Sequence, residues 1–180
     1  LSHNELDSID SSLFKKESVS YLNRIVDLDL SCNRFGNFSS FFFNDLPSLE
    51  KLNASFNLLA AFKNGSFSAL TRLKKLVMSR NRVIYLDRLL FEKNVFLEYI
   101  NLSSNLIEKL DTDLFATLGN LLVLDLSRNK ISTLGQFLFR NSGKLKSLYI
   151  HSNPILHIQN LAGLNSIENI YLSSSMLGTF

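Results

Sequence analysis

The chain repeats one pattern of apolar residues every 24 positions, and this period limits the possible folds more than any other feature. The clearest copy, LLVLDLSRNKISTL over residues 121–134, follows the template LxxLxLxxNxLxxL. Successive copies start 24 residues apart, with a last step of 22, at Ile25, Leu49, Leu73, Leu97, Leu121, Leu145 and Ile167. A sequence of this kind predicts a stack of similar units that share one core.

Two further columns of residues recur with the same period. An asparagine follows the apolar alternation in six copies, at Asn33, Asn57, Asn81, Asn105, Asn129 and Asn153. Ten residues after the asparagine position comes a phenylalanine, at Phe14, Phe43, Phe67, Phe91, Phe115 and Phe139, and the next equivalent residue is Gly163. Because an amide both donates and accepts hydrogen bonds, stacked asparagines can pair backbone groups that a turn leaves free. We therefore predict a structural asparagine ladder.

Each copy contains a short segment with the period of a β-strand. In Leu124-Asp125-Leu126 an apolar residue alternates with a polar one, as in a half-buried strand. About a dozen residues separate one such segment from the next, which is enough for a parallel crossover. One unit buries too little apolar surface to offset the entropy of ordering its backbone, so neighbouring units must share core surface.

The 24-residue unit resembles the leucine-rich repeat family in its typical animal extracellular form, in the style of Toll and Toll-like receptor ectodomains or insect leucine-rich immune proteins. The resemblance implies an α/β solenoid: a horseshoe with one parallel β-sheet on the concave face and irregular or short helical segments on the convex face. We expect one domain over residues 1–180. It would comprise a partial repeat at 1–24, full repeats starting near 25, 49, 73, 97, 121 and 145, and a partial repeat at 167–180. Extracellular members usually carry cysteine-rich caps, whereas this chain has only Cys32, so we expect a fragment without terminal caps.

The same resemblance implies a non-catalytic protein-recognition module of an extracellular receptor, in innate immune or developmental signalling. The sequence has no GxSxG, P-loop or HExxH motif, and His3, His151 and His157 lack the spacing of metal ligands. We therefore predict no enzymatic activity and no cofactor. An adhesion or matrix protein is one alternative, and a cytosolic scaffold, compatible with a single cysteine, is another.

Outward-facing strand residues and the residues just after each strand are free to contact a partner. Lys51, Lys75 and Arg80 form a small positive patch in neighbouring units, and tyrosine and arginine are frequent in binding hot spots. The candidate partner-binding residues are Lys51, Lys75, Arg80, Tyr99, Arg128, Tyr149, His151 and Tyr171. We expect a protein ligand or co-receptor, with homodimers and heterodimers both open.

Charge and composition narrow the partners and the location. The net charge of +3 is dispersed without a basic run, so no nucleic acid is expected. No apolar run approaches the roughly 18 residues of a membrane span, so this segment should make no membrane contact. Glycosylation signals begin at Asn37, Asn53, Asn64 and Asn101. Chance alone gives about three such signals, so they favour an extracellular or cell-surface location over the cytoplasm only slightly.

Overall fold

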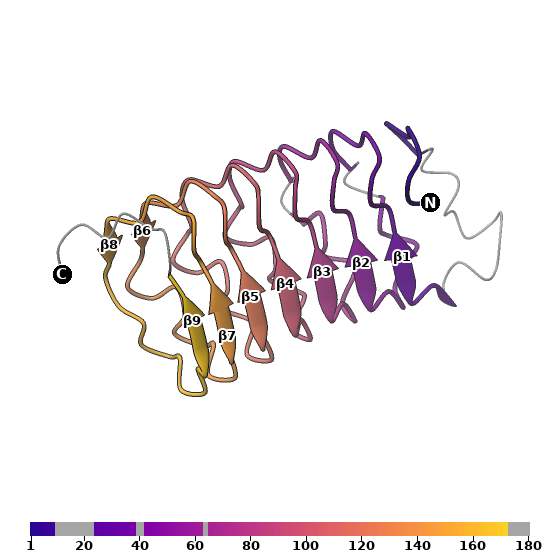
Figure 1. Ribbon diagram of the computed structural model, residues 1–180. Coiled ribbons are helices and arrows are strands. Elements are labelled where there is room, and N and C mark those ends of the chain that lie inside the picture. The colour runs from indigo at the N-terminus through magenta and orange to yellow at the C-terminus, as the bar shows by residue number, and fades with distance from the viewer. Residues whose placement is uncertain (10–23, 39–41, 63–64, 173–180) are drawn as a thin grey trace.

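A seven-stranded parallel sheet dominates the computed structural model, which describes residues 1–9, 24–38, 42–62 and 65–172 (Figure 1). The strands, in their order across the sheet, are β1 (Asp27–Asp29), β2 (Lys51–Asn53), β3 (Lys75–Val77), β4 (Tyr99–Asn101), β5 (Val123–Asp125), β7 (Ser147–Tyr149) and β9 (Asn169–Tyr171). Each residue of one strand pairs with the residue 24 positions later in the next, or 22 positions later between β7 and β9. The predicted parallel sheet built from one strand of each repeat is confirmed.

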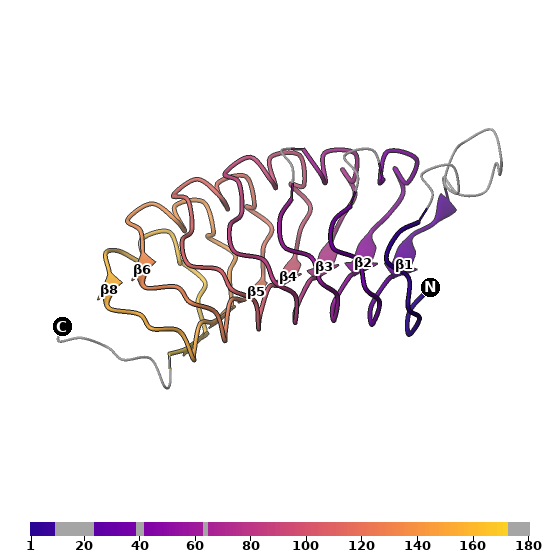
Figure 2. The ribbon, with the colours of Figure 1, turned by 90° about the horizontal axis from the view of Figure 1, so that it is seen from above.

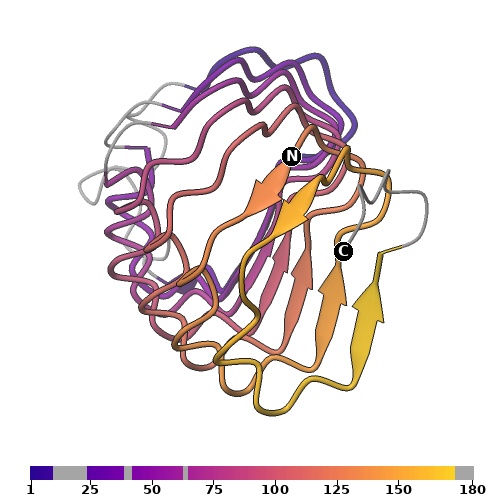
Figure 3. The same ribbon diagram turned by 90° about the vertical axis from the view of Figure 1, so that its left-hand side faces the viewer.

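Successive units coil around a common interior and stack into a curved solenoid. Seen along the stack, the sheet forms one wall and a column of turns forms the opposite wall (Figure 3). Seen from above, the strands lie on the inner side of the curve (Figure 2). Across the described ranges the outer wall contains turns and no α-helix, so the irregular form of the predicted convex face is the one observed.

A second, two-stranded sheet was not predicted. It pairs β6 (Thr133–Leu134) with β8 (His157–Ile158) in parallel, on a different side of the coil from the main sheet (Figure 3). Outside these pairs, the Gln159 amide donates to the Leu134 carbonyl at 3.0 Å. Two-residue strands are too short to leave an alternation in the sequence, which is why sequence reasoning missed them.

The interior is filled by the central residue of each strand and by the phenylalanine column. Leu52, Leu76, Ile100, Leu124 and Leu148 are buried, whereas Ile170 of the edge strand β9 is 38% exposed. The rings of Phe67, Phe91, Phe115 and Phe139 stack with centroid separations of 6.3 to 6.5 Å and interplanar angles of 14° or less. Phe14 lies outside the described residues. The stacked rings tie each unit to the next on the side opposite the sheet.

The phenylalanine column ends at Gly163 for a steric reason. Gly163 has a φ of +100°, and a Cβ at this position would lie 2.1 Å from the Phe139 carbonyl oxygen. This close approach accompanies the unit that is two residues shorter than the others. No side chain fits there without moving the backbone.

Gly163→Ala is expected to destabilise the fold by about 1–3 kcal/mol, because the new methyl group overlaps the backbone and the positive φ disfavours a side chain. Urea unfolding followed by circular dichroism would measure the change. Gly36→Ala is the matched control, because nothing lies within 4 Å of the added Cβ. Equal stability of the two variants would contradict the steric account.

Candidate binding surface

The six ladder asparagines fix the turn that follows each strand. Asn105 shows the arrangement: its Oδ1 accepts from the Val83 amide at 3.1 Å, and its Nδ2 donates to the Met78 and Leu102 carbonyls at 2.9 and 3.0 Å. Equivalent bonds link the preceding unit to Asn57, Asn81, Asn129 and Asn153, and Asn33 bonds in the same way to Leu6 and Leu1. The turn is therefore a rigid support for the side chains next to it.

The residue before each ladder asparagine adopts a left-handed backbone conformation. The φ angles lie between 54° and 57° at Cys32, Phe56, Arg80, Ser104, Arg128 and Ser152. The backbone amides of the first five of these residues donate to the next unit, as from Arg80 to the Ser103 carbonyl at 2.9 Å. Two predicted partner-binding residues, Arg80 and Arg128, thus have a fixed backbone and an exposed side chain just beyond the strand ends.

Lys51, Lys75 and Tyr99 lie side by side on the first strands of the concave face, and we call them the amino-terminal cluster. They are successive partners in the sheet register. The Lys75 ammonium lies 5.1 Å from the centroid of the Tyr99 ring, a cation–π contact, while Lys51 Nζ lies 3.8 Å from Asp27 Oδ2. Since Asp27 and Asp29 line the same hollow as both lysines, this surface carries mixed charge.

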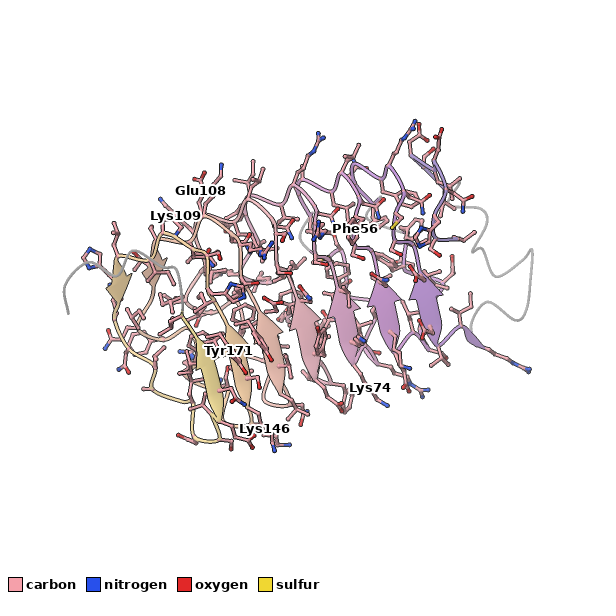
Figure 4. The ribbon with its side chains drawn as sticks, viewed as in Figure 1. Phe56, Lys74, Glu108, Lys109, Lys146 and Tyr171 are labelled. Atoms are coloured by element: carbon pink, nitrogen blue, oxygen red, sulfur yellow. The ribbon has the colours of Figure 1, made fainter. Side chains whose placement is uncertain are left out.

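Arg80 does not belong to this cluster, because its side chain packs against Phe56. Its guanidinium carbon lies 4.8 Å from the centroid of the Phe56 ring, one unit earlier in the turn column, and Phe56 is 49% exposed (Figure 4). Phe56 was not among the predicted partner-binding residues. An exposed phenylalanine in a column otherwise occupied by cysteine, arginine and serine was the available signal.

Tyr149 and Tyr171 form the centre of a carboxy-terminal cluster, which also includes Arg128 and His151. The two tyrosine rings stack with centroids 4.5 Å apart and an interplanar angle of 2°. The Arg128 amide donates to the His151 carbonyl at 2.9 Å, and His151 Nδ1 lies 3.3 Å from Ser152 Oγ. Strand β5 lies between the strands of the two clusters, so the predicted residues form two groups, and Arg80 belongs to neither.

The outward position at the end of four strands caps the following turn. Oδ1 of this residue accepts from the amide of the serine two residues later, in the pairs Asp29–Ser31, Asn53–Ser55, Asn101–Ser103 and Asp125–Ser127. Burial raises the pKa of the Asp29 carboxyl, but hydrogen bonds from the Ser31 side chain and backbone and from Asn53 outweigh it and leave the pKa below its usual value. Two glycosylation signals therefore coincide with a capping motif that aspartate fills equally well in neighbouring units.

The glycosylation candidates occupy different surroundings. Asn37 is exposed, Asn53 and Asn101 are half-buried on β2 and β4, and Asn64 lies outside the described residues. Their occupancy stays a prediction. Within the described ranges, no cluster of His, Cys, Asp and Glu could hold a metal ion, and no helix is long and apolar enough to cross a membrane.

The comparisons with known proteins decide the family. The model for leucine rich repeats matches residues 23–83 and 95–155 of this chain. The chain belongs to the leucine-rich repeat family. No curated protein sequence matches it.

Two similar solved structures place this leucine-rich repeat chain beside Toll-like proteins. The TLR13–ssRNA13 complex matches with a TM-score of 0.81 and 30% identity, over 86% of this chain and 22% of that one. The Toll–Spatzle complex from Drosophila matches with a TM-score of 0.85 and 24% identity, over 96% of this chain and 23% of that one, and shows the fold alone. The chain thus spans less than a quarter of the length of either protein.

Proposed function

We propose that the chain is a non-catalytic recognition module of an extracellular, receptor-type leucine-rich repeat protein, and that it binds a protein ligand or co-receptor on its concave face. The observation that carries the proposal is the stacked pair of Tyr149 and Tyr171 on adjacent strands, with Tyr171 44% exposed. Aromatic side chains held by a rigid sheet lose little conformational freedom on binding, so more of the contact energy is retained.

A nucleic-acid ligand is the second candidate. The expectation of no nucleic acid rested on the lack of a basic run, and it is not supported, because the similar TLR13 structure is a complex with ssRNA. A protein ligand is favoured on the concave face because Asp27 and Asp29 lie beside Lys51 and Lys75 there. These carboxylates would repel the phosphates of a nucleic acid, whereas the surface of a protein can present both positive and negative groups.

The wider role follows from the same relatives and is part of the proposal. Similarity to Toll and TLR13 supports a place at the cell surface and a role in innate immune or developmental signalling. A Toll/interleukin-receptor signalling domain in the full-length protein would support this role. Immunoglobulin or matrix modules would favour an adhesion protein, and the lack of a signal peptide would favour a cytosolic scaffold.

The proposal predicts that Lys75→Glu combined with Tyr149→Ala and Tyr171→Ala abolishes partner capture without unfolding the chain. The full-length protein would be displayed on cultured cells, and captured secreted proteins identified by mass spectrometry. The matched control combines Lys93→Glu, Phe96→Ala and Phe137→Ala, all exposed and outside the strands. A partner retained equally by both variants would remove the concave face from consideration.

A further inference from the structure

The turns that follow the strands contain no acidic residue within two positions of a ladder asparagine. We define the turn edge as the five residues centred on each ladder asparagine, at 31–35, 55–59, 79–83, 103–107, 127–131 and 151–155. Its charged residues are all basic: Arg34, Arg80, Arg82, Arg128 and Lys130. The opposite edge, where the strands begin, mixes both signs and pairs them, as in Lys74–Glu50 at 2.9 Å and Lys146–Glu168 at 3.0 Å (Figure 4).

Four cations of the turn edge are available to a partner. Arg34 pairs with Glu5 at 3.0 Å, but no residue in the described part of the chain forms an ion pair with Arg80, Arg82, Arg128 or Lys130, and all four are exposed.

Among the described residues, Asp111, Asp125 and Glu108 form no ion pair with these cations. Asp125 Oδ1 accepts from the Ser127 amide and hydroxyl at 2.9 and 2.7 Å, and Asp111 accepts from the Tyr85 hydroxyl at 2.6 Å. Glu108 lies farther along the loop than the turn edge, away from the strand ends (Figure 4).

The spacing of the cations is set by the backbone. The amides of Arg80, Ser104 and Arg128 each donate to the next unit at 2.9 Å, so the turns continue the hydrogen-bonded stacking of the sheet. Neighbouring units are therefore about 4.8 Å apart. The pair Arg80 and Arg82 lies two units, or about 10 Å, from the pair Arg128 and Lys130.

Apolar side chains fill the positions between the cations. Phe56 and Leu58 precede the first pair, and Leu106 lies between the pairs. A peptide in the extended polyproline-II conformation rises about 3.1 Å per residue with three residues per turn, so carboxylates three residues apart lie on one face and span about 9 Å. A polymer that carries a charge on every monomer would place some of its charges next to Leu58 and Leu106, where there is no cation to pair with them.

We propose that the turn edge binds an extended acidic segment of a partner protein, with carboxylates about three residues apart and apolar side chains between them. This inference rests on the proposed protein-recognition function and adds the chemistry of the partner. It also assigns a binding role to Arg82 and Lys130, which were not among the predicted partner-binding residues.

The test uses four defined probes: a peptide with aspartate at every third position and leucine between, its asparagine counterpart, a heparin oligosaccharide and a single-stranded RNA. We expect the aspartate peptide to bind the chain in fluorescence anisotropy and the asparagine peptide not to bind. Arg82→Glu with Lys130→Glu should weaken that binding at least tenfold. The control variant, Arg72→Glu with Lys144→Glu, makes the same change in net charge at exposed sites outside the turn edge. Its affinity for the aspartate peptide should change less than twofold.

Several results would overturn the inference. They are the absence of aspartate-peptide binding, an equal loss of peptide affinity in the two charge-reversal variants, and tighter binding of heparin or RNA than of the peptide. Circular dichroism would confirm that each variant folds. The concave variant with Lys75→Glu, Tyr149→Ala and Tyr171→Ala should still bind the peptide, so failure of the turn edge and failure of the concave site are separable.

Discussion

Phe115→Ala is expected to lower the free energy of unfolding by about 3–5 kcal/mol. The Phe115 side chain is fully buried and stacks between Phe91 at 6.3 Å and Phe139 at 6.5 Å. Its removal leaves a cavity that three consecutive units line. Backbone hydrogen bonds between these units limit how far the cavity can collapse, so the cost should lie in the range for a large core truncation.

Urea unfolding monitored by circular dichroism would measure this loss. Phe96→Ala is the matched control, since Phe96 lies in the neighbouring loop and is 53% exposed. Its loss should be below about 1 kcal/mol. Similar losses for both variants would mean that the phenylalanine column does not hold the units together.

Asn105→Ala is expected to cost about 3 kcal/mol or more. The alanine leaves the buried Val83 amide without its acceptor, and it removes the Asn105 bonds to the Met78 and Leu102 carbonyls, although Met78 keeps the bond from Asn81 at 3.1 Å. An unsatisfied buried amide costs roughly 1–3 kcal/mol, and each lost hydrogen bond about 1 kcal/mol. Asn105→Asp should also destabilise the fold, because a carboxylate cannot donate to the Met78 and Leu102 carbonyls.

The control for the asparagine ladder is Asn120→Ala, which removes two exposed hydrogen bonds, one to the Val95 carbonyl and one from Lys144 Nζ. We expect a loss of about 1 kcal/mol or less for this variant. Thermal and urea unfolding of the three variants would test the order. A melting temperature of Asn105→Ala equal to that of the unchanged chain would contradict a stabilising role for the asparagine ladder.

The sequence predicted the sheet because a fixed period determines the register. Once Leu76, Ile100 and Leu124 recur at 24-residue intervals on the inner side of the strands, only one parallel pairing buries all of them. The asparagine positions followed from the same period. Gly163 was visible as a break in the phenylalanine column, but its cause, contact with the Phe139 carbonyl, requires coordinates.

The candidate site was less predictable because its contacts depend on side-chain conformations across units. The sequence grouped Arg80 with Lys75, whereas Arg80 lies over Phe56 and Lys75 over Tyr99. It also treated the residues after each strand as an extension of the strand columns. The charge of the turn edge becomes visible only when the turns are seen to stack as regularly as the strands.

The left-handed residue before each asparagine has a wider consequence. Its main chain is committed to the neighbouring coil, but its side chain supports nothing in the interior, so cysteine, phenylalanine, arginine and serine all occur there. The scaffold therefore offers six regularly spaced positions whose side chains can be substituted one at a time. Such substitutions would give a set of binding proteins that share one architecture and differ only in what they recognise.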